Sequence, residues 1–553
     1  MSEIYRHTNY PGNMKAEVNP DAYETVVDLF NEKVKTWGHK PAFTCMGKTL
    51  TYGELDVLSA QFAAYLQNST DLEPGDRIAL QMPNILQFPI AIWGAMRAGL
   101  VVVNTNPLYT DRELEHQMND SGAKAIVVYA GMAAQVLRLQ SKTPIERVIV
   151  TEIADMHPPI KRALVNTVVK RVKKMVPAYD ASSTVSFRDA LNEGKKFSYR
   201  PVKTGHDDPI IFQYTGGTTG VAKGAMLTNR NLIANMLQSY EFFQISLNDG
   251  EETFITPLPL YHIYAFTVHG MVLMYTGNHS VLIPNPRDIP AFVKELASNE
   301  FTGFVGLNTL FVALCNNEGF QKLDFSKLKF TISGGMALTH AAADQWENTT
   351  GCPIYEGYGM TESSPVISFN PPTFQQIGTI GIPAPSTEVR IVGEDGEIQP
   401  FGERGELCVR GPQVMKGYWN RPADTESTID SDGFLKTGDI AILQEDGYLR
   451  IVDRKKDMIV VSGFNVYPNE IEDVLASHPD VVECAAIGVP NEKTGEAIKV
   501  FVVAQNSVTE ESLIAHCREN LTGYKVPKLF EFRDELPKTN VGKVLRRELR
   551  PTE

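Results

Sequence analysis

Cysteine is scarce in this chain, and its six copies, at positions 45, 315, 352, 408, 484 and 517, form no CxxC pair and no cluster. This spacing predicts neither a disulfide framework nor a zinc site, and it fits a reducing compartment. The N-terminal stretch "MSEIYRHTNYPGNMKAEVNP" has no apolar core, so we expect no signal peptide.

An excess of basic charge is also missing. The chain has 52 lysines and arginines against 66 acidic residues, which gives a net charge of -14. Nucleic acid is therefore not an expected partner, because phosphate backbones are bound by basic faces. With 553 residues, the chain exceeds the size of one core and should form two to four structural units.

Long uninterrupted apolar runs are absent as well. Residues 253–286 contain no Asp, Glu, Lys or Arg, but prolines, histidines, Gly277 and Asn278 interrupt them. The longest apolar piece, residues 263–275, is shorter than the roughly 20 residues that a membrane span needs. We expect a buried helix and strand here; a transmembrane segment is the alternative.

Apolar strands and helices alternate from residue 41 onward. A capping box at Thr51 and Glu54 opens a helical pattern, and "DRIALQM", "LVVVNT" and "AKAIVVY" are typical strands. This alternation favours a parallel sheet covered by helices. From about Gly378 the pattern changes to short strands with DG and GE turns, and after Asp453 a small α+β segment follows.

The loop "YTGGTTGVAKG" joins an apolar strand to a second one. Glycines let backbone N–H groups converge on an anion, threonine hydroxyls add donors, and Lys223 supplies positive charge. The loop lacks GxxxxGK[ST], so an ordinary P-loop is not expected; a flexible surface turn is the alternative. Its candidate phosphate-binding residues are Tyr214, Thr215, Gly216, Gly217, Thr218, Thr219, Gly220 and Lys223.

Four further motifs follow in order: "YGMTE", "TGD", "DRKKD" and "NVGKVLRRE". Together with the glycine-rich loop they resemble the adenylate-forming superfamily of acyl-CoA synthetases, adenylation domains and luciferases, from about residue 25 to 550. The stretches "PLYHIYAF", "NPRDIP" and "LTGYKVPKLFEFRDELPK" are similar to those of bacterial long-chain fatty-acid–CoA ligases.

This resemblance implies an α/β fold in two parts. Residues 1–453 would form a large N-terminal domain of two doubly wound α/β subdomains plus a β-rich subdomain, and residues 454–553 a small mobile α+β domain. It implies that ATP and a long-chain fatty acid give acyl-AMP and pyrophosphate, after which CoA takes the acyl group. ATP, CoA and the fatty acid would be its partners, with Mg²⁺ as cofactor.

The resemblance also implies roles for individual residues. Lys543 would bridge the carboxylate and the α-phosphate, where two anions must meet, and Arg454 would reach the ribose or the phosphates. His262 would be a third catalytic residue beside Lys543 and Arg454, at the junction of the nucleotide and acyl pockets, and with Phe266 it would line the acyl pocket. Phe266 stands where a related enzyme type has a tryptophan gate, and phenylalanine lacks the indole donor, so a hydrogen-bonded gate is not expected.

The remaining implied contacts concern the nucleotide, the metal, the hinge and CoA. Thr215 and Glu362 would hold Mg²⁺ through oxygen ligands. Asp453 and Lys456 would form a hinge, and Ser462, Gly463 and Phe464 would face CoA. The nucleotide would further contact Gly334, Gly335, Glu356, Gly357, Tyr358, Gly359, Thr361, Asp439 and Arg454.

Other functions stay open at this point. A medium-chain or aryl-acid CoA ligase is the main alternative, because pocket residues do not give pocket volume. A non-enzymatic nucleotide- or lipid-binding module would not need Lys543, Glu362 or Asp439. A homodimer is compatible with the sequence and is left open.

Residues 160–176 form a basic amphipathic pattern between prolines. Leu164, Val165, Val168, Val169, Val172 and Val176 share one face, and Lys161, Arg162, Lys170, Arg171, Lys173 and Lys174 supply the charge. Such a helix is typical of docking on an anionic membrane, and it predicts a cytoplasmic enzyme bound peripherally to the inner membrane. The alternative is a surface helix whose apolar face packs on the core.

Overall fold

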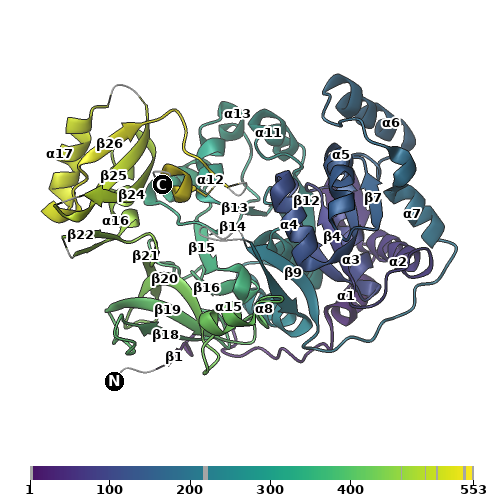
Figure 1. Cartoon of the computed structure of the whole chain (residues 1–553), viewed down its shortest axis with the longest axis horizontal. Coiled ribbons are helices and arrows are strands. Elements are labelled where there is room, and N and C mark those ends of the chain that lie inside the picture. The colour runs from purple at the N-terminus through teal and green to yellow at the C-terminus, as the bar shows by residue number, and fades with distance from the viewer. Residues whose placement is uncertain are drawn as a thin grey trace.

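The computed structural model describes residues 4–215, 222–462, 464–491, 493–505, 508–539 and 543–550. Its described part contains four β-sheets. Two helix-covered sheets and an antiparallel sheet make up the larger body, and the C-terminal sheet with its helices stands to one side of it (Figure 1). This arrangement confirms the α/β fold class, with a large N-terminal region and a small C-terminal one.

The first sheet has the order β10-β9-β5-β4-β6-β7-β8, and all its neighbours are parallel except β9 and β10. Apolar residues fill its central strands, as expected for a parallel sheet buried on both faces. Its strands are β4 (Arg77–Gln81), β5 (Val101–Asn104), β6 (Ala123–Tyr129), β7 (Arg147–Thr151), β8 (Val185–Ser186), β9 (Pro209–Thr215) and β10 (Lys223–Thr228).

The second sheet has the order β17-β16-β15-β14-β13-β11-β12-β2-β3, with parallel strands from β15 to β2 and antiparallel edges. Its strands are β2 (Pro41–Cys45), β3 (Lys48–Thr51), β11 (Thr253–Thr256), β12 (His279–Leu282), β13 (Gly303–Gly306), β14 (Phe330–Gly334), β15 (Ile354–Gly359), β16 (Val366–Phe369) and β17 (Ile382–Pro383).

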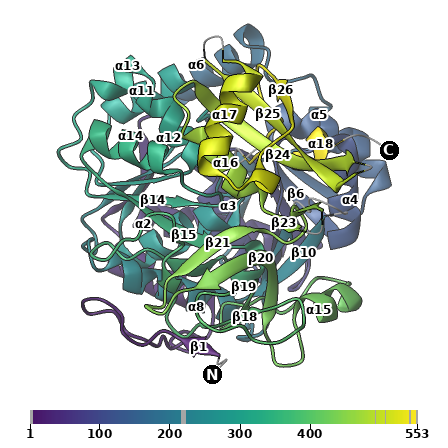
Figure 2. The ribbon, with the colours of Figure 1, turned by 90° about the vertical axis from the view of Figure 1, so that its left-hand side faces the viewer.

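The other two sheets correspond to the β-rich and α+β segments expected after residue 378. The antiparallel sheet comprises β1 (Tyr5–Arg6), β18 (Glu388–Val392), β19 (Arg404–Arg410), β20 (Leu435–Leu443) and β21 (Leu449–Arg454). The C-terminal sheet comprises β22 (Ile459–Val461), β23 (Phe464–Val466), β24 (Val481–Asn491), β25 (Gly495–Ala504) and β26 (Leu529–Phe532). Figure 2 shows this last sheet in front of the larger body.

Local signals account for several helix ends. Thr51 and Glu54 form the expected capping box at the start of α2, and Thr110 and Glu113 form another at α4. Helices of the first part are α1 (Val26–Thr36), α2 (Tyr52–Asn68), α3 (Gln87–Arg97), α4 (Asp111–Ser121), α5 (Ala130–Leu139), α6 (Pro159–Thr167), α7 (Phe187–Gly194) and α8 (Asn229–Phe243).

The later helices are α9 (Ile263–Ala265), α10 (Leu273–Thr276), α11 (Ile289–Ala297), α12 (Asn308–Cys315), α13 (Glu318–Gln321), α14 (His340–Thr350), α15 (Pro422–Thr428), α16 (Pro468–Ala476), α17 (Glu510–Asn520) and α18 (Arg546–Leu549). The 3-10 turns are η1 (Gln140–Lys142), η3 (Ala181–Ser183), η5 (Thr361–Ser363) and η6 (Gly523–Lys525), and the π-helical segments are η2 (Val168–Val172) and η4 (Phe266–Val272).

The uncharged segment forms the expected buried helix and strands, from β11 through η4 to β12. Among the described residues, no helix combines the length and the apolar character needed to cross a bilayer. All six cysteines are free, and five of them are buried.

The basic segment is shorter than the sequence pattern suggested. It forms α6 and η2 but ends at Val172, and Lys174 has a left-handed backbone with φ of 52°. No residue of α6 or η2 is buried. Ile160 is 86% exposed, and Leu164 and Val172 are also exposed, whereas Val165, Val168, Val169 and Val176 are half-buried, so the apolar face is only partly covered.

The core behind the second sheet depends on Trp346 of α14. This side chain is completely buried, and its ring lies 4.8 Å from that of Phe311 and 5.0 Å from that of Phe304. Its Nε1 donates to Thr331 Oγ1 over 3.2 Å. Trp346 therefore fills this satellite core and ties α14 to β14.

We expect Trp346→Ala to lower the free energy of unfolding by about 3–5 kcal/mol, because it removes the largest side chain and leaves a cavity. Urea denaturation followed by circular dichroism measures this loss. Phe374→Ala is the control, since Phe374 is 61% exposed and its removal should change stability little. Equal effects of the two substitutions would contradict the assigned role of Trp346.

Candidate active site

The strand before the glycine-rich loop and the strand after it form an antiparallel hairpin. Thr215 at the end of β9 lies directly opposite Lys223 at the start of β10. Tyr214 is anchored by its hydroxyl, which donates to Asp120 Oδ2 over 2.7 Å. Gly216, Gly217, Thr218, Thr219 and Gly220 lie outside the described residues, so the hairpin fixes only the two ends of the loop.

Lys223 contacts a residue that no sequence motif marked. Its Nζ lies 2.5 Å from Asp424 Oδ1 of α15 and 5.2 Å from the centre of the Tyr418 ring. Both partners of the ion pair are about one-third exposed, so water screens the attraction and the pair is weak. Asp424 therefore holds Lys223 only weakly.

Glu362 is a buried carboxylate beside this hairpin. It lies in η5, is 7% exposed, and its Oε1 accepts a hydrogen bond of 2.7 Å from the Tyr418 hydroxyl. Burial raises the pKa of Glu362, and the Tyr418 hydrogen bond opposes that rise. The segment that carries Tyr418 bridges to β10 at Ala225, so Glu362 and the loop are held together.

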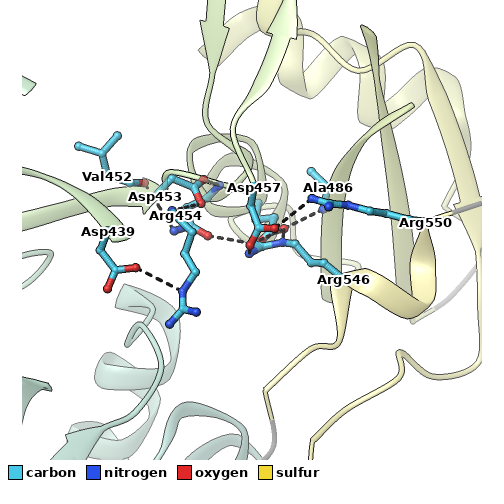
Figure 3. A network of polar contacts seen from close by, with 10 residues as sticks. Asp439, Val452, Asp453, Arg454, Asp457, Ala486, Arg546 and Arg550 are labelled. Carbon is cyan, nitrogen blue, oxygen red and sulfur yellow. Dashed lines mark hydrogen bonds and ion pairs between the residues drawn. The ribbon is translucent and has the colours of Figure 1, made fainter. Parts of the chain in front are cut away.

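Asp439, Tyr358 and Arg454 form one polar group. Asp439 and Arg454 are paired across β20 and β21, and Arg454 Nε lies 3.3 Å from Asp439 Oδ1 (Figure 3). The Tyr358 hydroxyl donates to Asp439 Oδ2. Tyr358 and Arg454, both expected at the nucleotide, are thus held in place by Asp439. The Asp439 carboxylate lies where the second sheet, which carries Tyr358, meets the antiparallel sheet.

Glycines at the ends of β14 and β15 allow close backbone approach. Gly334 and Gly357 are paired across the two strands, and a Cβ on Gly334 would lie 3.1 Å from the Tyr264 ring. A Cβ on Gly359 would lie 2.0 Å from the Pro365 carbonyl oxygen, so only glycine fits there. Gly335 has φ of 84°, which also favours glycine. Thr361 begins η5 next to Glu362.

Glu356 was expected at the nucleotide, but its carboxyl group points into the protein. It is 8% exposed, and its Oε1 accepts a hydrogen bond of 3.2 Å from Leu338 N. Burial raises the pKa of Glu356 to about 8. In this structure its side chain supports the segment after β14, and its backbone continues β15 towards Tyr358.

Lys543 and His262 lie close enough to the site to affect each other. Burial lowers the pKa of Lys543 to about 8, nearby Arg454 and Lys456 add repulsion, and Asp439 and Glu362 oppose the shift. Burial also lowers the pKa of His262 to about 4, and the charge of Lys543 contributes. The small C-terminal domain therefore presents Lys543 to the residues that the sequence assigned to the nucleotide.

Phe266 lines a very small apolar cavity of about 10 Å³. Phe266 begins η4, shortly after His262 in the chain, and is only 1% exposed. A Cβ on Gly270 would lie 2.6 Å from the Phe266 ring, so this glycine fixes where the ring sits. The other walls are Phe43, Phe88, Pro89, Ile92, Trp93 and Leu260.

The expected hinge and CoA residues lie on the C-terminal side of the site. Asp453 is completely buried, and Lys456 is exposed in the link between β21 and β22. Ser462 has φ of 53°, and its N donates to Thr494 O over 2.7 Å. Phe464 is 56% exposed and stacks on Tyr524, while Gly463 lies outside the described residues.

Sequence reasoning missed Tyr418, Asp120 and Asp424. Each contacts a motif residue from a segment far away in the chain, and none belongs to a recognisable pattern of its own. Their roles follow from tertiary packing, which the local sequence does not encode.

Comparison with known proteins places this geometry in a family. A family model described as AMP-binding enzyme matches residues 30–419. The chain belongs to the AMP-binding enzyme family. A second model, AMP-binding enzyme C-terminal domain, matches residues 470–543. These matches confirm the resemblance that the ordered motifs indicated.

Individual relatives cover nearly the whole chain. A long-chain-fatty-acid–CoA ligase of Escherichia coli O6:H1 is 52% identical over 543 residues, covering 98% of this chain and 97% of its own. The protein of the same description from Bacillus subtilis is 34% identical over 98% of this chain and 96% of its own. The crystal structure of ATP-bound MatB from Rhodopseudomonas palustris is similar, with a TM-score of 0.81 and 28% sequence identity. The match covers 95% of this chain and 98% of the MatB chain.

The buried carboxyl of Glu356 generates a pH-dependent prediction. A carboxyl whose pKa rises from 4.5 to about 8 on folding binds more protons in the folded state between these values. Stability must then fall as pH rises through this window, by at most about 1.4 kcal/mol per pH unit. Glu356→Gln does not titrate, so the variant should gain free energy of unfolding relative to the parent between pH 5 and 8.

Urea denaturation of the two proteins at several pH values measures this difference. Glu397→Gln is the control, because Glu397 is exposed and its removal should leave the pH dependence unchanged. A constant difference between Glu356→Gln and the parent from pH 5 to 8 would contradict a raised pKa at Glu356.

Proposed function

We propose that this enzyme ligates a long-chain fatty acid to CoA in two steps, through an acyl-AMP, with release of AMP and pyrophosphate. The observation that carries the proposal is the convergence of Lys543 with Arg454, Asp439 and Glu362. The full-length identity of 52% to a long-chain-fatty-acid–CoA ligase supports the choice of substrate.

The first step brings a carboxylate to a phosphate, so the site has to offset repulsion between two anions. Lys543 would supply positive charge between them, and Arg454 and Lys223 would supply it at the phosphates. Asp439 would accept hydrogen bonds from the ribose hydroxyls once these replace Tyr358 or Arg454. His262 stays uncharged at neutral pH, because its pKa is about 4, and would act as a neutral hydrogen-bonding group beside the acyl carboxylate.

The residues present fit a magnesium ion held mainly by phosphates and water. Glu362 is buried with a single protein donor on Oε1, and Thr215 lies on the neighbouring hairpin. Bound Mg²⁺ would neutralise charge on the phosphates of ATP. The chain itself would contribute these two oxygen ligands and the closed, partly buried surroundings.

The acyl chain would extend from His262 towards the cavity beside Phe266. The cavity is lined by aromatic and aliphatic side chains, which suit an alkyl chain, but its volume of about 10 Å³ is far too small to hold one in this conformation. Phe266 would therefore move aside, as a gate without the indole hydrogen bond. The second step would need the C-terminal domain to rotate about Lys456 and present Ser462, Gly463 and Phe464 to CoA.

A pyrophosphate-release screen tests this function. Acids from acetate to oleate, together with benzoate and cinnamate, are supplied with ATP and Mg²⁺, with and without CoA. The proposal requires the highest kcat/KM for long-chain acids and acyl-CoA formation only when CoA is present. A preference for octanoate or for the aryl acids would favour the alternative ligase classes, and no release with any acid would favour a binding module.

Lys543 should matter for the first step alone and only while it is charged. Lys543→Ala should lower the kcat/KM of adenylation by two to three orders of magnitude, about 3–4 kcal/mol, and leave thioester formation from supplied acyl-AMP largely intact. Because its pKa is about 8, adenylation by the parent should fall about tenfold per pH unit above that value.

Lys543→Arg is the control, because it keeps the charge and should remove this alkaline decline in whatever activity remains. Pyrophosphate release and acyl-CoA formation are measured separately for each variant. An equal loss in both half-reactions of Lys543→Ala would contradict the assigned role.

We further propose that α6 and η2 dock the enzyme on the cytoplasmic face of the inner membrane. Ile160, Leu164 and Val172 are exposed, and Lys170, Arg171, Lys173 and Lys174 are exposed beside them, on a chain of net charge -14. Lys161 is anchored, since its Nζ donates to the Met46 carbonyl. Membrane docking would place the enzyme where long-chain acids dissolve. Light scattering would determine whether the enzyme is a homodimer.

Replacing Lys170, Arg171, Lys173 and Lys174 with glutamine should weaken binding to anionic vesicles. Each basic residue near such a surface contributes about 1 kcal/mol, an attraction that salt screens. Activity on detergent-dispersed fatty acid should not change. Vesicle co-sedimentation at low and high salt measures the binding.

The matched control replaces four exposed cations elsewhere, Lys294, Lys322, Lys327 and Arg518, with glutamine. This control has the same net charge as the docking variant and should bind like the parent. If both variants bind equally well, α6 and η2 are not the docking site.

A further inference from the structure

The link between the two parts of the chain is short and lies beside a buried acid. Strand β21 belongs to the antiparallel sheet, where Asp453 pairs with Ile440, and it ends at Arg454. The C-terminal sheet begins with β22 at Ile459. Every contact between β21 and α16 therefore crosses the link that contains Lys456.

Asp453 makes such a crossing contact with its side chain. Its Oδ2 accepts a hydrogen bond of 2.7 Å from the backbone N of Asn469, and its Oδ1 accepts one of 2.6 Å from Arg454 N. Asn469 is the second residue of α16, whose N-cap residue Tyr467 provides no side-chain cap. The carboxylate of one domain thus caps a helix of the other.

The same helix is tied to the segment that carries Lys543. Arg546 Nη2 donates to Asn469 Oδ1 over 2.9 Å and to Glu472 Oε2 over 2.7 Å. Arg546 also lies 3.5 Å from Asp457 (Figure 3). A series of contacts therefore runs from Asp453 through Asn469 and Arg546 to the turn that holds Lys543.

Asn469 Nδ2 also donates to Val452 O over a long 3.5 Å, and two further contacts across the link are more exposed. Asn465 Nδ2 lies 3.2 Å from Glu394 Oε1 at the surface, and the exposed Arg404 lies 5.3 Å from the Tyr467 ring. Such contacts compete with water and contribute little. Asp453, by contrast, is fully buried, and a buried acceptor is costly to leave without its donor.

Burying the charged carboxylate of Asp453 costs free energy. Burial raises the pKa of Asp453 to about 7, although the cation of Arg546 opposes the rise. Glu472 is a second acid nearby and adds to the rise. An apolar residue would avoid this cost, so the acid is explained by the specific contact that it makes.

We propose that Asp453 is a positioning residue: by capping α16 across the link, its carboxylate holds the C-terminal domain in the orientation that presents Lys543. The proposal rests on the two-step ligase function. Formation of acyl-AMP would use this orientation, and release of Asn469 from Asp453 would accompany the rotation that brings CoA to the acyl-AMP.

The test measures the two half-reactions separately in Asp453→Ala. Adenylation, followed by pyrophosphate release, should fall about tenfold because fewer molecules present Lys543. Thioester formation from supplied acyl-AMP should be unchanged or faster. Asp453→Asn keeps one acceptor oxygen, so it should restore part of the adenylation rate, which a general loss of folding would not allow.

Arg550→Gln is the matched control. Arg550 pairs with Asp457 at 3.0 Å, a contact in the same network that joins the C-terminal segment to the link itself and does not reach β21. Its removal should leave the ratio of the two half-reactions unchanged. An equal fall of both half-reactions in Asp453→Ala, or no change in their ratio in Asp453→Ala and Asp453→Asn, would overturn the proposal.

The experiment distinguishes failure of the ligase function from failure of the positioning role of Asp453. If the parent enzyme forms no acyl-AMP from any acid, the ligase function fails before any variant is compared. If the parent performs both half-reactions and the Asp453 variants keep the parental ratio, only the positioning role fails.

Discussion

Bringing positive charge to one place from distant parts of the chain is the constraint on which this structure depends. Lys223 comes from the edge of the first sheet, Arg454 from the antiparallel sheet and Lys543 from the C-terminal domain. Cations crowded together repel one another, and Arg454 indeed helps to lower the pKa of Lys543. The protein offsets this repulsion with Asp439, Glu362 and Asp424, each of which comes from the larger body. A site of this kind stays weakly charged until anionic reactants replace the internal partners.

The frame that holds these groups is rigid, because its positions follow from strand pairing. Thr215 and Lys223 are fixed by the β9–β10 register, Asp439 and Arg454 by β20–β21, and Gly334 and Gly357 by β14–β15. Lys543 has no such frame within the larger body. Its position depends on how the small domain sits, so one domain orientation and one set of contacts near the link decide whether the cation reaches the site.

The local sequence was enough to predict the strands, several helix ends and the change to short β-strands near residue 378. Periodicity reports which residues face a core, and parallel strands have apolar runs that are easily recognised. It could not report that the buried Glu356 accepts a hydrogen bond from Leu338 N, or that Tyr418 and Asp424 contact Glu362 and Lys223, since these contacts depend on tertiary packing. The basic segment shows a different limit. Its helical pattern continued to Val176, but the left-handed backbone of Lys174 ends the helix earlier. The pattern also could not show how much of the apolar face would be buried.

Under the proposed mechanism, the buried acid at the link would let one small domain serve two steps. A contact that holds one orientation very strongly would favour acyl-AMP formation but trap the enzyme before CoA can react. A shift between two orientations from 1:99 to 99:1 requires about 5.5 kcal/mol, so contacts of only a few kcal/mol leave both accessible. Asp453 suits that range, because its hydrogen bonds stabilise the observed orientation while its burial penalises the charge that makes them. The two opposing terms would keep the net preference for the observed orientation small.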